Sequence, residues 1–249
     1  MLYSLMYHHI NGDKFSNDID IFEKHLEYLT ANFSIVTPED TLPRDRDALC
    51  ITFDDAYYDF YHFVFPLLKK YNIKAVLAVP TGLIAEETTA TIAERLSLGH
   101  QEIYVDKNYQ KFGSFCTWSE LKEMQESGLV VMASHSHKHK DLASEGIDLN
   151  EEIVGSKKIL EEKLNTTIDS FILPFGRYNY DSVTLLKQHY QYIFKVGQGV
   201  NRDFRGVKNL IYRIDADNIT NIEILFSFKN ILKYKIKSLI KSIYDGIQK

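Results

Sequence analysis

The chain has little cysteine and no recognisable secretory leader. Only two of its 249 residues are cysteines, Cys50 and Cys116, and they form no C-x-x-C pair. A disulfide framework and a cysteine-based metal site are therefore excluded, and a reducing compartment fits this usage. The N-terminal residues contain no basic leader, no long apolar core and no cleavage site made of small residues.

These absences set expectations for location and partners. If Met1 is the natural start, we expect a cytoplasmic protein, although a chain trimmed of its signal would read the same way. No apolar stretch approaches the roughly 20 residues that a membrane-spanning helix needs. The formal net charge of −5 argues against nucleic acid as the partner.

Linkers rich in proline and glycine, internal repeats and low-complexity tracts are also absent, so we expect a single domain over residues 1–249. Short apolar runs that predict strands alternate with longer segments of helical periodicity. The predicted strands span residues 2–7, 49–53, 75–79, 129–133, 170–173, 191–196 and 210–214. The predicted helices span residues 18–32, 57–71, 117–127, 150–164, 182–189 and 222–247.

This alternation predicts an α/β fold with a parallel sheet, either open or closed into a barrel. Residues 82–115 are the least regular part, and we expect an insertion there with a short helix near residues 91–98. Functional side chains of such folds collect past the carboxyl ends of the strands. Four predicted strands are followed by acids, imidazoles or a rigid turn. These are His8 and His9, Asp54 and Asp55, the run 134–139, and the turn Pro174, Phe175 and Gly176.

The two adjacent carboxylates, Asp54 and Asp55, repel each other, and a divalent cation would relieve that repulsion. The alternative is that one of them caps the following helix. His135 and His139 are four residues apart, so on a helical turn both rings would point the same way, as in a zinc site. The alternative here is a solvated polar loop. His137 falls on another face of such a turn and is left out.

Two histidines and one aspartate would leave a coordination position for water, and the other aspartate would be free to act as a base. The motifs resemble those of the polysaccharide deacetylase family, also called the chitooligosaccharide deacetylase homology domain. Residues 51–55 resemble its Thr-Phe-Asp-Asp-Gly signature, and residues 135–139 match its His-Ser/Thr-x-x-His motif. Residues 174–176 match the core of its third motif, a turn that forms one wall of the groove. The alternative is an ordinary turn, because proline and glycine are common in turns.

The resemblance covers residues 2 to about 214, with the motifs in the family's order. It implies a single-domain distorted or incomplete (β/α) barrel with parallel strands. It also implies a metal-dependent hydrolase that removes acetyl groups from N-acetylated sugars of a glycan or glycan precursor. One divalent metal ion, expected to be Zn²⁺, would be bound by Asp55, His135 and His139, with Asp54 as general base.

Three departures from the family pattern stand out. Ala56 occupies the position of the usual glycine, and residues 168–173 lack the arginine that holds the catalytic aspartate. Arg213 or Arg177 could replace that arginine, and we group Arg213 with Pro174, Phe175 and Gly176 as substrate-binding residues. No histidine follows His189, so the late histidine that supplies the general acid is missing.

The first strand offers a replacement for this acid. Tyr7-His8-His9-Ile10 resembles the start of the poly-N-acetylglucosamine deacetylase type, where an early Tyr-His takes the place of the late histidine. In a closed barrel the first and last strands are neighbours, which makes this relocation reasonable. We favour His8 over His9 as the catalytic residue, and an ordinary surface histidine is the alternative.

The predicted C-terminal helix, about residues 222–247, is basic and amphipathic. Its apolar stripe comprises Leu232, Ile236, Leu239, Ile240, Ile243 and Ile247, and its lysines are Lys229, Lys233, Lys235, Lys237 and Lys241. Such a helix either makes peripheral contact with an anionic membrane or closes the barrel with its lysines in water.

Rival functions also remain open on the sequence. The first is a hydrolase of the same fold that cleaves another C–N amide bond. The second is a non-catalytic carbohydrate-binding relative, which the missing arginine and late histidine suggest. The third is an unrelated barrel whose aspartates merely cap a helix.

Overall fold

The structure is a computed structural model that describes residues 1–244. Its core is a closed ring of parallel strands in the order β1-β10-β9-β8-β7-β6-β5, and β1 pairs with both β10 and β5 to close it. The strands are β1 (Leu2–Tyr7), β5 (Ala48–Phe53), β6 (Ala75–Val79), β7 (Val130–Ser134), β8 (Ser170–Ile172), β9 (Tyr192–Val196) and β10 (Ile211–Asp215). The short β4 (Ser34–Ile35) pairs with the start of β5 outside this ring. The expectation of a distorted or incomplete (β/α) barrel with parallel strands is confirmed as a closed barrel of seven parallel strands.

The strands are nearly continuous apolar runs, because both faces of a parallel barrel strand are buried. Every residue of β1, β5 and β6 is buried. The register then decides which strand ends meet. Tyr7 pairs with Phe53, and Met6 pairs with Asp215. The residues that follow β1, β5 and β10 therefore emerge side by side at one end of the barrel.

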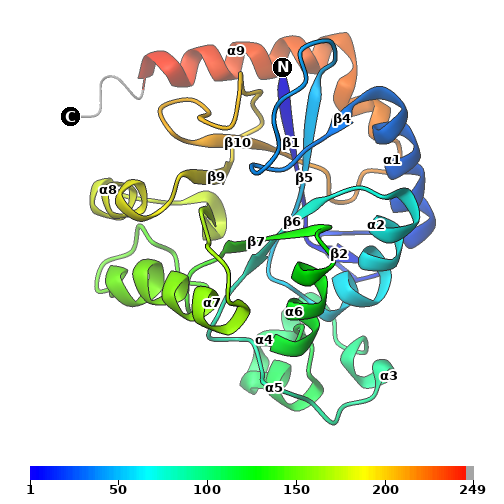
Figure 1. Ribbon diagram of the computed structural model, residues 1–249, viewed down its shortest axis with the longest axis vertical. Coiled ribbons are helices and arrows are strands. Elements are labelled where there is room, and N and C mark those ends of the chain that lie inside the picture. Colours follow the sequence, from blue (N-terminus) through cyan, green and yellow to red (C-terminus); the bar gives the residue numbers. More distant parts are fainter. Residues whose placement is uncertain (245–249) are drawn as a thin grey trace.

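Helices surround the ring (Figure 1), with α1 and α2 on one side, α7 and α8 on the other and α9 across the top. The α-helices are α1 (Ile19–Asn32), α2 (Phe65–Tyr71), α3 (Ile92–Arg95), α4 (His100–Tyr104), α5 (Asn108–Phe112), α6 (Trp118–Glu126), α7 (Ser156–Leu164), α8 (Tyr180–His189) and α9 (Phe228–Tyr244). Shorter elements are β2 (His9–Ile10), β3 (Ser16–Asn17), η1 (Phe60–Val64), η2 (Val105–Lys107), η3 (Asn150–Gly155), η4 (Pro174–Gly176) and η5 (Ile222–Phe226).

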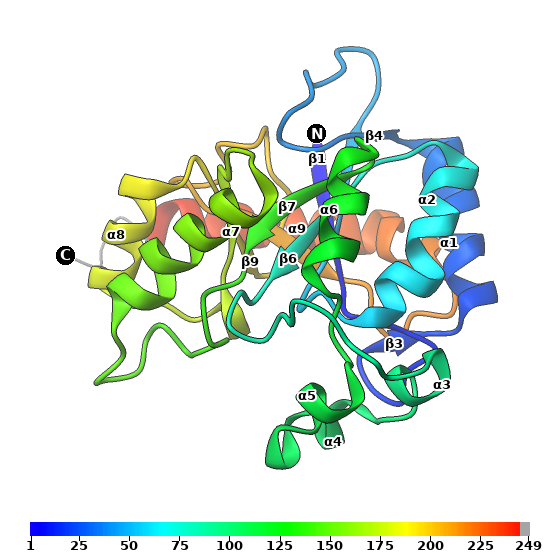
Figure 2. The same cartoon turned by 60° about the horizontal axis from the view of Figure 1, so that its bottom comes forward.

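Two predicted helices differ from those observed. The insertion carries three short helices, α3 to α5, where one was expected, and Figure 2 shows them as a group at one end of the molecule. The predicted helix 222–247 is divided into η5 and α9, because Ser227 between them has an extended backbone with ψ 149°. Its last predicted residues, 245–247, lie outside the described residues. Within residues 1–244, no helix is long and apolar enough to cross a membrane.

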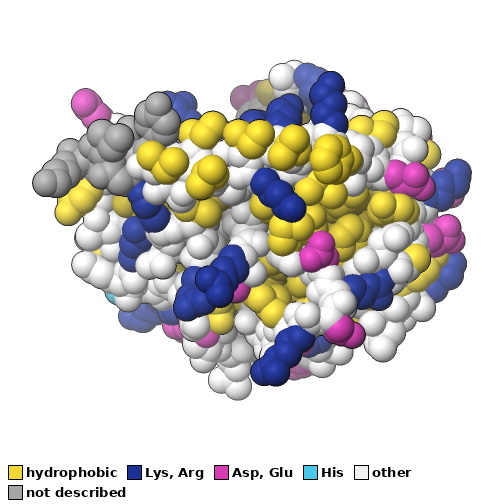
Figure 3. All heavy atoms as spheres, turned by 90° about the horizontal axis from the view of Figure 1, so that it is seen from above, with side chains coloured by type: hydrophobic (Ala, Val, Ile, Leu, Met, Phe, Trp, Pro, Cys, Tyr) yellow, Lys and Arg dark blue, Asp and Glu magenta, His cyan; other side chains and the backbone are white. Residues whose placement is uncertain are grey.

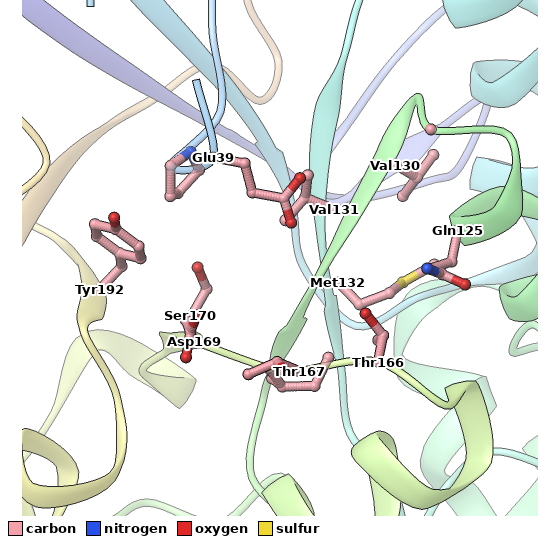
Figure 4. Close-up of a pocket in the computed structure, with 13 residues that line it drawn as sticks. Glu39, Gln125, Val130, Val131, Met132, Thr166, Thr167, Asp169, Ser170 and Tyr192 are labelled. Carbon is pink, nitrogen blue, oxygen red and sulfur yellow. The ribbon is translucent and has the colours of Figure 1, made fainter. Parts of the chain in front are cut away.

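A cavity of about 360 Å³ opens at the end of the barrel where the strands begin (Figure 4). Its lining includes Val130, Ser170 and Tyr192, which are the first residues of β7, β8 and β9. None of the predicted site residues lines it. The predicted site residues instead lie at the opposite end of the barrel, past the carboxyl ends of the strands.

Candidate metal centre and active site

Three predicted ligands meet past the ends of β5 and β7. Nε2 of His139 lies 3.2 Å from Oδ1 of Asp55, and Nε2 of His135 lies 3.5 Å from the same oxygen. One ligand atom from each residue lies within 4.8 Å of the other two. Asp55 and His135 are buried, while His139 is partly open to solvent. The three side chains thus form a compact cluster with one accessible side.

The two histidines do not share a helical turn, so that part of the sequence interpretation is wrong. Residues 135–139 form an irregular loop in which Ser136 (φ 65°) and His139 (φ 52°) have left-handed backbone conformations. The buried carboxylate of Glu152 accepts hydrogen bonds from the backbone N–H groups of His137 and Lys138, at 3.0 and 2.8 Å. The loop is therefore anchored from η3, and its reversal brings the two rings together.

Unsatisfied polar atoms indicate that this cluster fits a divalent cation. Oδ1 of Asp55 is buried and has no hydrogen-bond partner, an arrangement that is costly unless a ligand is bound. Nδ1 of His135 lies 2.7 Å from the carbonyl oxygen of Ile172, so the ring donates from Nδ1 and turns the Nε2 lone pair to the cluster. Burial lowers the pKa of His135 from 6.5 to about 4, which keeps the ring neutral, as a metal ligand must be.

The carboxylate of Asp54 is bound by the guanidinium group of Arg213. Arg213 donates from Nη1 to Oδ1 of Asp54 at 2.6 Å and from Nη2 to Oδ2 at 2.8 Å. Burial raises the pKa of Asp54, but the charge of Arg213 and neighbouring groups outweighs burial, so the pKa is well below its usual range. Arg213 also donates to Oγ1 of Thr52 and is fully buried. Its position fits support of Asp54 rather than direct contact with a substrate.

His8 lies on the other side of Asp54, between two carboxylates. Its Nδ1 lies 2.6 Å from Oδ2 of Asp217, and its Nε2 lies 3.7 Å from Oδ2 of Asp54. Burial lowers the pKa of His8, but the hydrogen bond to Asp217 and the charges of Asp54 and Asp217 outweigh burial and raise the pKa to about 9. A protonated His8 therefore presents its Nε2–H toward Asp54.

The side chain of the neighbouring His9 points away from Asp54, toward Asp59 and the insertion. Its Nδ1 lies 2.7 Å from Oδ2 of Asp59, and its Nε2 lies 3.2 Å from Nδ1 of His100. Its ring stacks on Tyr57 at a centroid distance of 3.8 Å. Because successive side chains of an extended segment point to opposite sides, His8 and His9 cannot both face Asp54. The geometry favours His8.

The third motif reaches the same cluster. Pro174–Gly176 forms a single 3₁₀ turn after β8, and Phe175 within it has a left-handed backbone with φ 57°. The ring of Phe175 lies 4.8 Å from the ring of His139, and this side chain is 61% exposed. The turn therefore forms one wall beside the candidate metal ligands, with an aromatic face open to solvent.

Sequence reasoning missed two contributors to the site. Asp217 follows β10, and it would have been found had the rule of inspecting strand ends been applied to residues 210–214. Tyr104, on the insertion, hydrogen-bonds to Tyr57 with 2.6 Å between the hydroxyl oxygens. Burial raises the pKa of Tyr104, and the negative charge of Asp55 raises it further. Through Tyr57 the insertion contacts the segment that directly follows Asp54 and Asp55. No sequence signal marked this contact.

Ala56, the departure from the usual glycine, has a left-handed backbone with φ 54° and a fully buried side chain. Glycine adopts this conformation without a steric cost, whereas alanine pays a modest one. The side chains of Asp54 and Asp55 on the same turn face the cluster, so helix capping does not account for them.

Comparisons with known proteins agree with this geometry. A family model described as polysaccharide deacetylase matches residues 41–193. A Bacillus subtilis (strain 168) protein named as a polysaccharide deacetylase, YxkH, is 30% identical over 194 residues, which are 72% of this chain and 58% of the relative. The poly-beta-1,6-N-acetyl-D-glucosamine N-deacetylase of Escherichia coli (strain K12) is 36% identical over 94 residues, 38% of this chain and 12% of that enzyme.

The chain therefore spans little more than half of the first of these relatives and a small part of the second. Among solved structures, the Streptococcus pyogenes deacetylase PplD in complex with acetate has a TM-score of 0.68 at 24% identity. That match covers 94% of this chain and 97% of the other, and it shows a common fold. With the family model matching more than half of its length, this chain belongs to the polysaccharide deacetylase family.

Proposed function

We propose that this protein is a metal-dependent hydrolase that removes acetyl groups from the N-acetylated sugars of a glycan or glycan precursor. The observation that carries the proposal is the joint position of two groups. The Asp55, His135 and His139 cluster, in which Oδ1 of Asp55 has no hydrogen-bond partner, lies beside Asp54 and His8. An amide hydrolase needs a base that activates water and an acid that protonates the departing amine. Asp54 and His8 are placed to fill these two roles beside the cluster.

Asp55, His135 and His139 would hold one divalent cation, and we propose Zn²⁺. Two imidazoles and one carboxylate form a donor set that suits zinc and leaves room for a water. When bound, such an ion supplies a water of lowered pKa and polarises the amide carbonyl. Cobalt, nickel and manganese accept the same ligand types, and metal analysis of the purified protein would identify the ion.

Asp54 would accept the proton of the attacking water. It stays ionised because of Arg213, so it is always able to accept, but its low pKa also makes it a weak base. It therefore suits a water that is already acidic. His8, protonated at neutral pH, would donate from Nε2 to the leaving nitrogen while Asp217 holds its Nδ1–H.

The turn of Pro174, Phe175 and Gly176 would form the wall on which a sugar ring lies. Phe175 offers an exposed aromatic face next to His139, and aromatic faces pack well against the apolar faces of sugars. A backbone N–H near Phe175 would stabilise the developing oxyanion. We propose that Arg213, fully buried, acts through Asp54 and not by direct contact with the glycan.

The test combines metal analysis with acetate release. Several relatives are named as poly-beta-1,6-N-acetyl-D-glucosamine deacetylases, so β-1,6-linked N-acetylglucosamine oligomers are the first substrate to test, with β-1,4-linked oligomers beside them. We expect one metal ion per chain and acetate release that stops after chelation and returns with added zinc.

Other outcomes would select among the rival functions. Stoichiometric metal without acetate release from any oligomer would favour a hydrolase of another C–N amide bond, which a panel of amides would reveal. Oligomer binding without turnover in the metal-loaded protein would indicate a non-catalytic carbohydrate-binding relative. Absence of bound metal, even after dialysis against zinc, would refute the proposed function.

A further inference from the structure

Helix α9 is attached to the barrel by a narrow polar and aromatic face. Tyr234 is buried with 3% of its surface exposed. Oγ of Ser238 accepts a hydrogen bond from the backbone N–H of Val200 at 2.9 Å and lies 2.8 Å from the carbonyl oxygen of the same residue. Lys241 donates to the carbonyl oxygen of Gly197. These contacts fix which side of the helix faces outward.

The apolar stripe of α9 is on that outward side. Its described members are between 46% and 61% exposed: Leu232 (48%), Ile236 (48%), Leu239 (61%), Ile240 (46%) and Ile243 (56%). Phe228, at the start of the helix, is 83% exposed, and Ile247 lies outside the described residues. Figure 3 shows hydrophobic side chains in a row along the top of the molecule, where α9 runs. Helix α9 therefore packs on the barrel, but through the opposite face, and its apolar stripe does not take part. A contiguous apolar face of this kind marks an interaction surface.

The charge of α9 indicates what covers this face. Its 17 residues include five lysines and no acidic residue, whereas the whole chain has a net charge of −5. Lys229, Lys233 and Lys235 are exposed beside the apolar stripe. Positive charge is thus concentrated on one helix of an otherwise acidic protein, and an anionic surface would attract α9 while repelling the remainder.

We propose that α9 docks the protein on an anionic lipid bilayer, with the apolar stripe in the headgroup region and the lysines against lipid phosphates and carboxylates. A basic amphipathic helix with an outward apolar face has the properties of an interfacial helix. A second copy of the chain fits less well. A twofold pairing through this face would bring the same helix, with its exposed Lys229, Lys233 and Lys235, against itself.

Docking through α9 also orients the candidate site. In Figure 1, α9 lies on the side where β1 begins, whereas the site residues follow the carboxyl ends of β1, β5 and β7. The site would therefore open away from the bilayer. The proposal stands independently of the proposed function, because it rests on α9 alone.

The experiment is flotation of the full chain with phosphatidylcholine vesicles that contain or lack phosphatidylserine. We expect binding only with phosphatidylserine, and weaker binding at ~1 M than at ~0.1 M salt, where charges are screened. Each lysine near the membrane contributes about five-fold to affinity, so the double variant Lys233→Gln with Lys235→Gln should bind about 25-fold more weakly. Leu232→Ser with Ile236→Ser and Leu239→Ser should abolish it.

Matched substitutions elsewhere serve as controls. Ile92→Ser, at an exposed apolar position of α3, and Lys69→Gln with Lys122→Gln, at exposed lysines, should leave binding unchanged. Circular dichroism melts would verify that each variant is folded. Equal binding to both vesicle types, no binding to either, or unchanged binding of the triple serine variant would overturn the proposal. The proposal would also be overturned if light scattering showed a dimer for the wild type and the controls but a monomer for the triple serine variant.

Discussion

Arg213 and Asp54 form a two-point ion pair across the barrel, with Nη1 to Oδ1 at 2.6 Å and Nη2 to Oδ2 at 2.8 Å. The two residues are 159 positions apart in the chain. A fully buried guanidinium that engages both oxygens fixes the orientation of the carboxylate as well as its charge. This arrangement supplies the support for Asp54 that the third motif of this chain lacks.

Replacement of Arg213 by lysine tests this support. Lysine keeps the charge but cannot reach both oxygens, so Asp54 should lose its fixed orientation. We expect kcat for acetate release to fall about 100-fold, because misplacement of a catalytic group by ~1 Å has an effect of this size. Metal content should be unchanged. A variant with full activity, or one that loses metal and activity together, would contradict a positioning role.

Asp54 and His135 should separate catalysis from metal binding. Asp54→Asn preserves the shape of the side chain and removes the base, so it should retain metal and lose at least about 100-fold in kcat. His135→Ala removes a ligand and should lose the metal. Inductively coupled plasma mass spectrometry of both variants, beside acetate release, makes the comparison. Full turnover by Asp54→Asn would show that Asp54 is not the general base.

The pH dependence of kcat should report on His8. Its pKa is raised to about 9 by Asp217 and Asp54, so the proton that it donates is present at neutral pH and is lost as pH rises through the pKa. Asp217→Asn removes one of these charges, so the alkaline decline of kcat should move to lower pH by at least about one unit. A cation at the Asp55, His135 and His139 cluster would lower the pKa of His8 in both proteins, so the difference between their profiles reports on Asp217 alone. Identical profiles would show that Asp217 does not act through His8.

His25 should contribute to acid sensitivity in a different way. It is 1% exposed, and burial lowers its pKa from 6.5 to about 4. The unfolded chain therefore binds a proton below pH 6.5 that the folded protein does not bind until about pH 4, and stability falls over that interval. At pH 5 this loss amounts to about 2 kcal/mol.

Urea unfolding of the wild type and of His25→Leu at pH 7 and pH 5 would measure this effect. The stability difference between the two proteins should move in favour of the variant by that amount as the pH is lowered. Because the other groups titrate alike in both, an unchanged difference would show that His25 is charged in the folded protein.

The strands and the three motifs could be predicted from the sequence because their signals are local. Apolar runs of barrel strands are short and continuous, and the adjacent acids, the spaced histidines and the Pro-Phe-Gly turn follow them directly. The family resemblance of these motifs implied that Asp55, His135 and His139 form one ligand set, and the structure brings the three together. The helical turn expected between the two histidines is instead a loop anchored by Glu152.

Only the tertiary structure decided which distant residues support the site. Barrel closure places Asp217 beside His8 and Arg213 beneath Asp54, because β1 lies between β5 and β10. It likewise decided that the apolar stripe of α9 faces outward, since Tyr234 and Ser238 hold the opposite side to the barrel. The sequence by itself determined the chemistry at each strand end. The pairings between those ends depend on strand register and closure, which link residues too far apart for any local pattern to report.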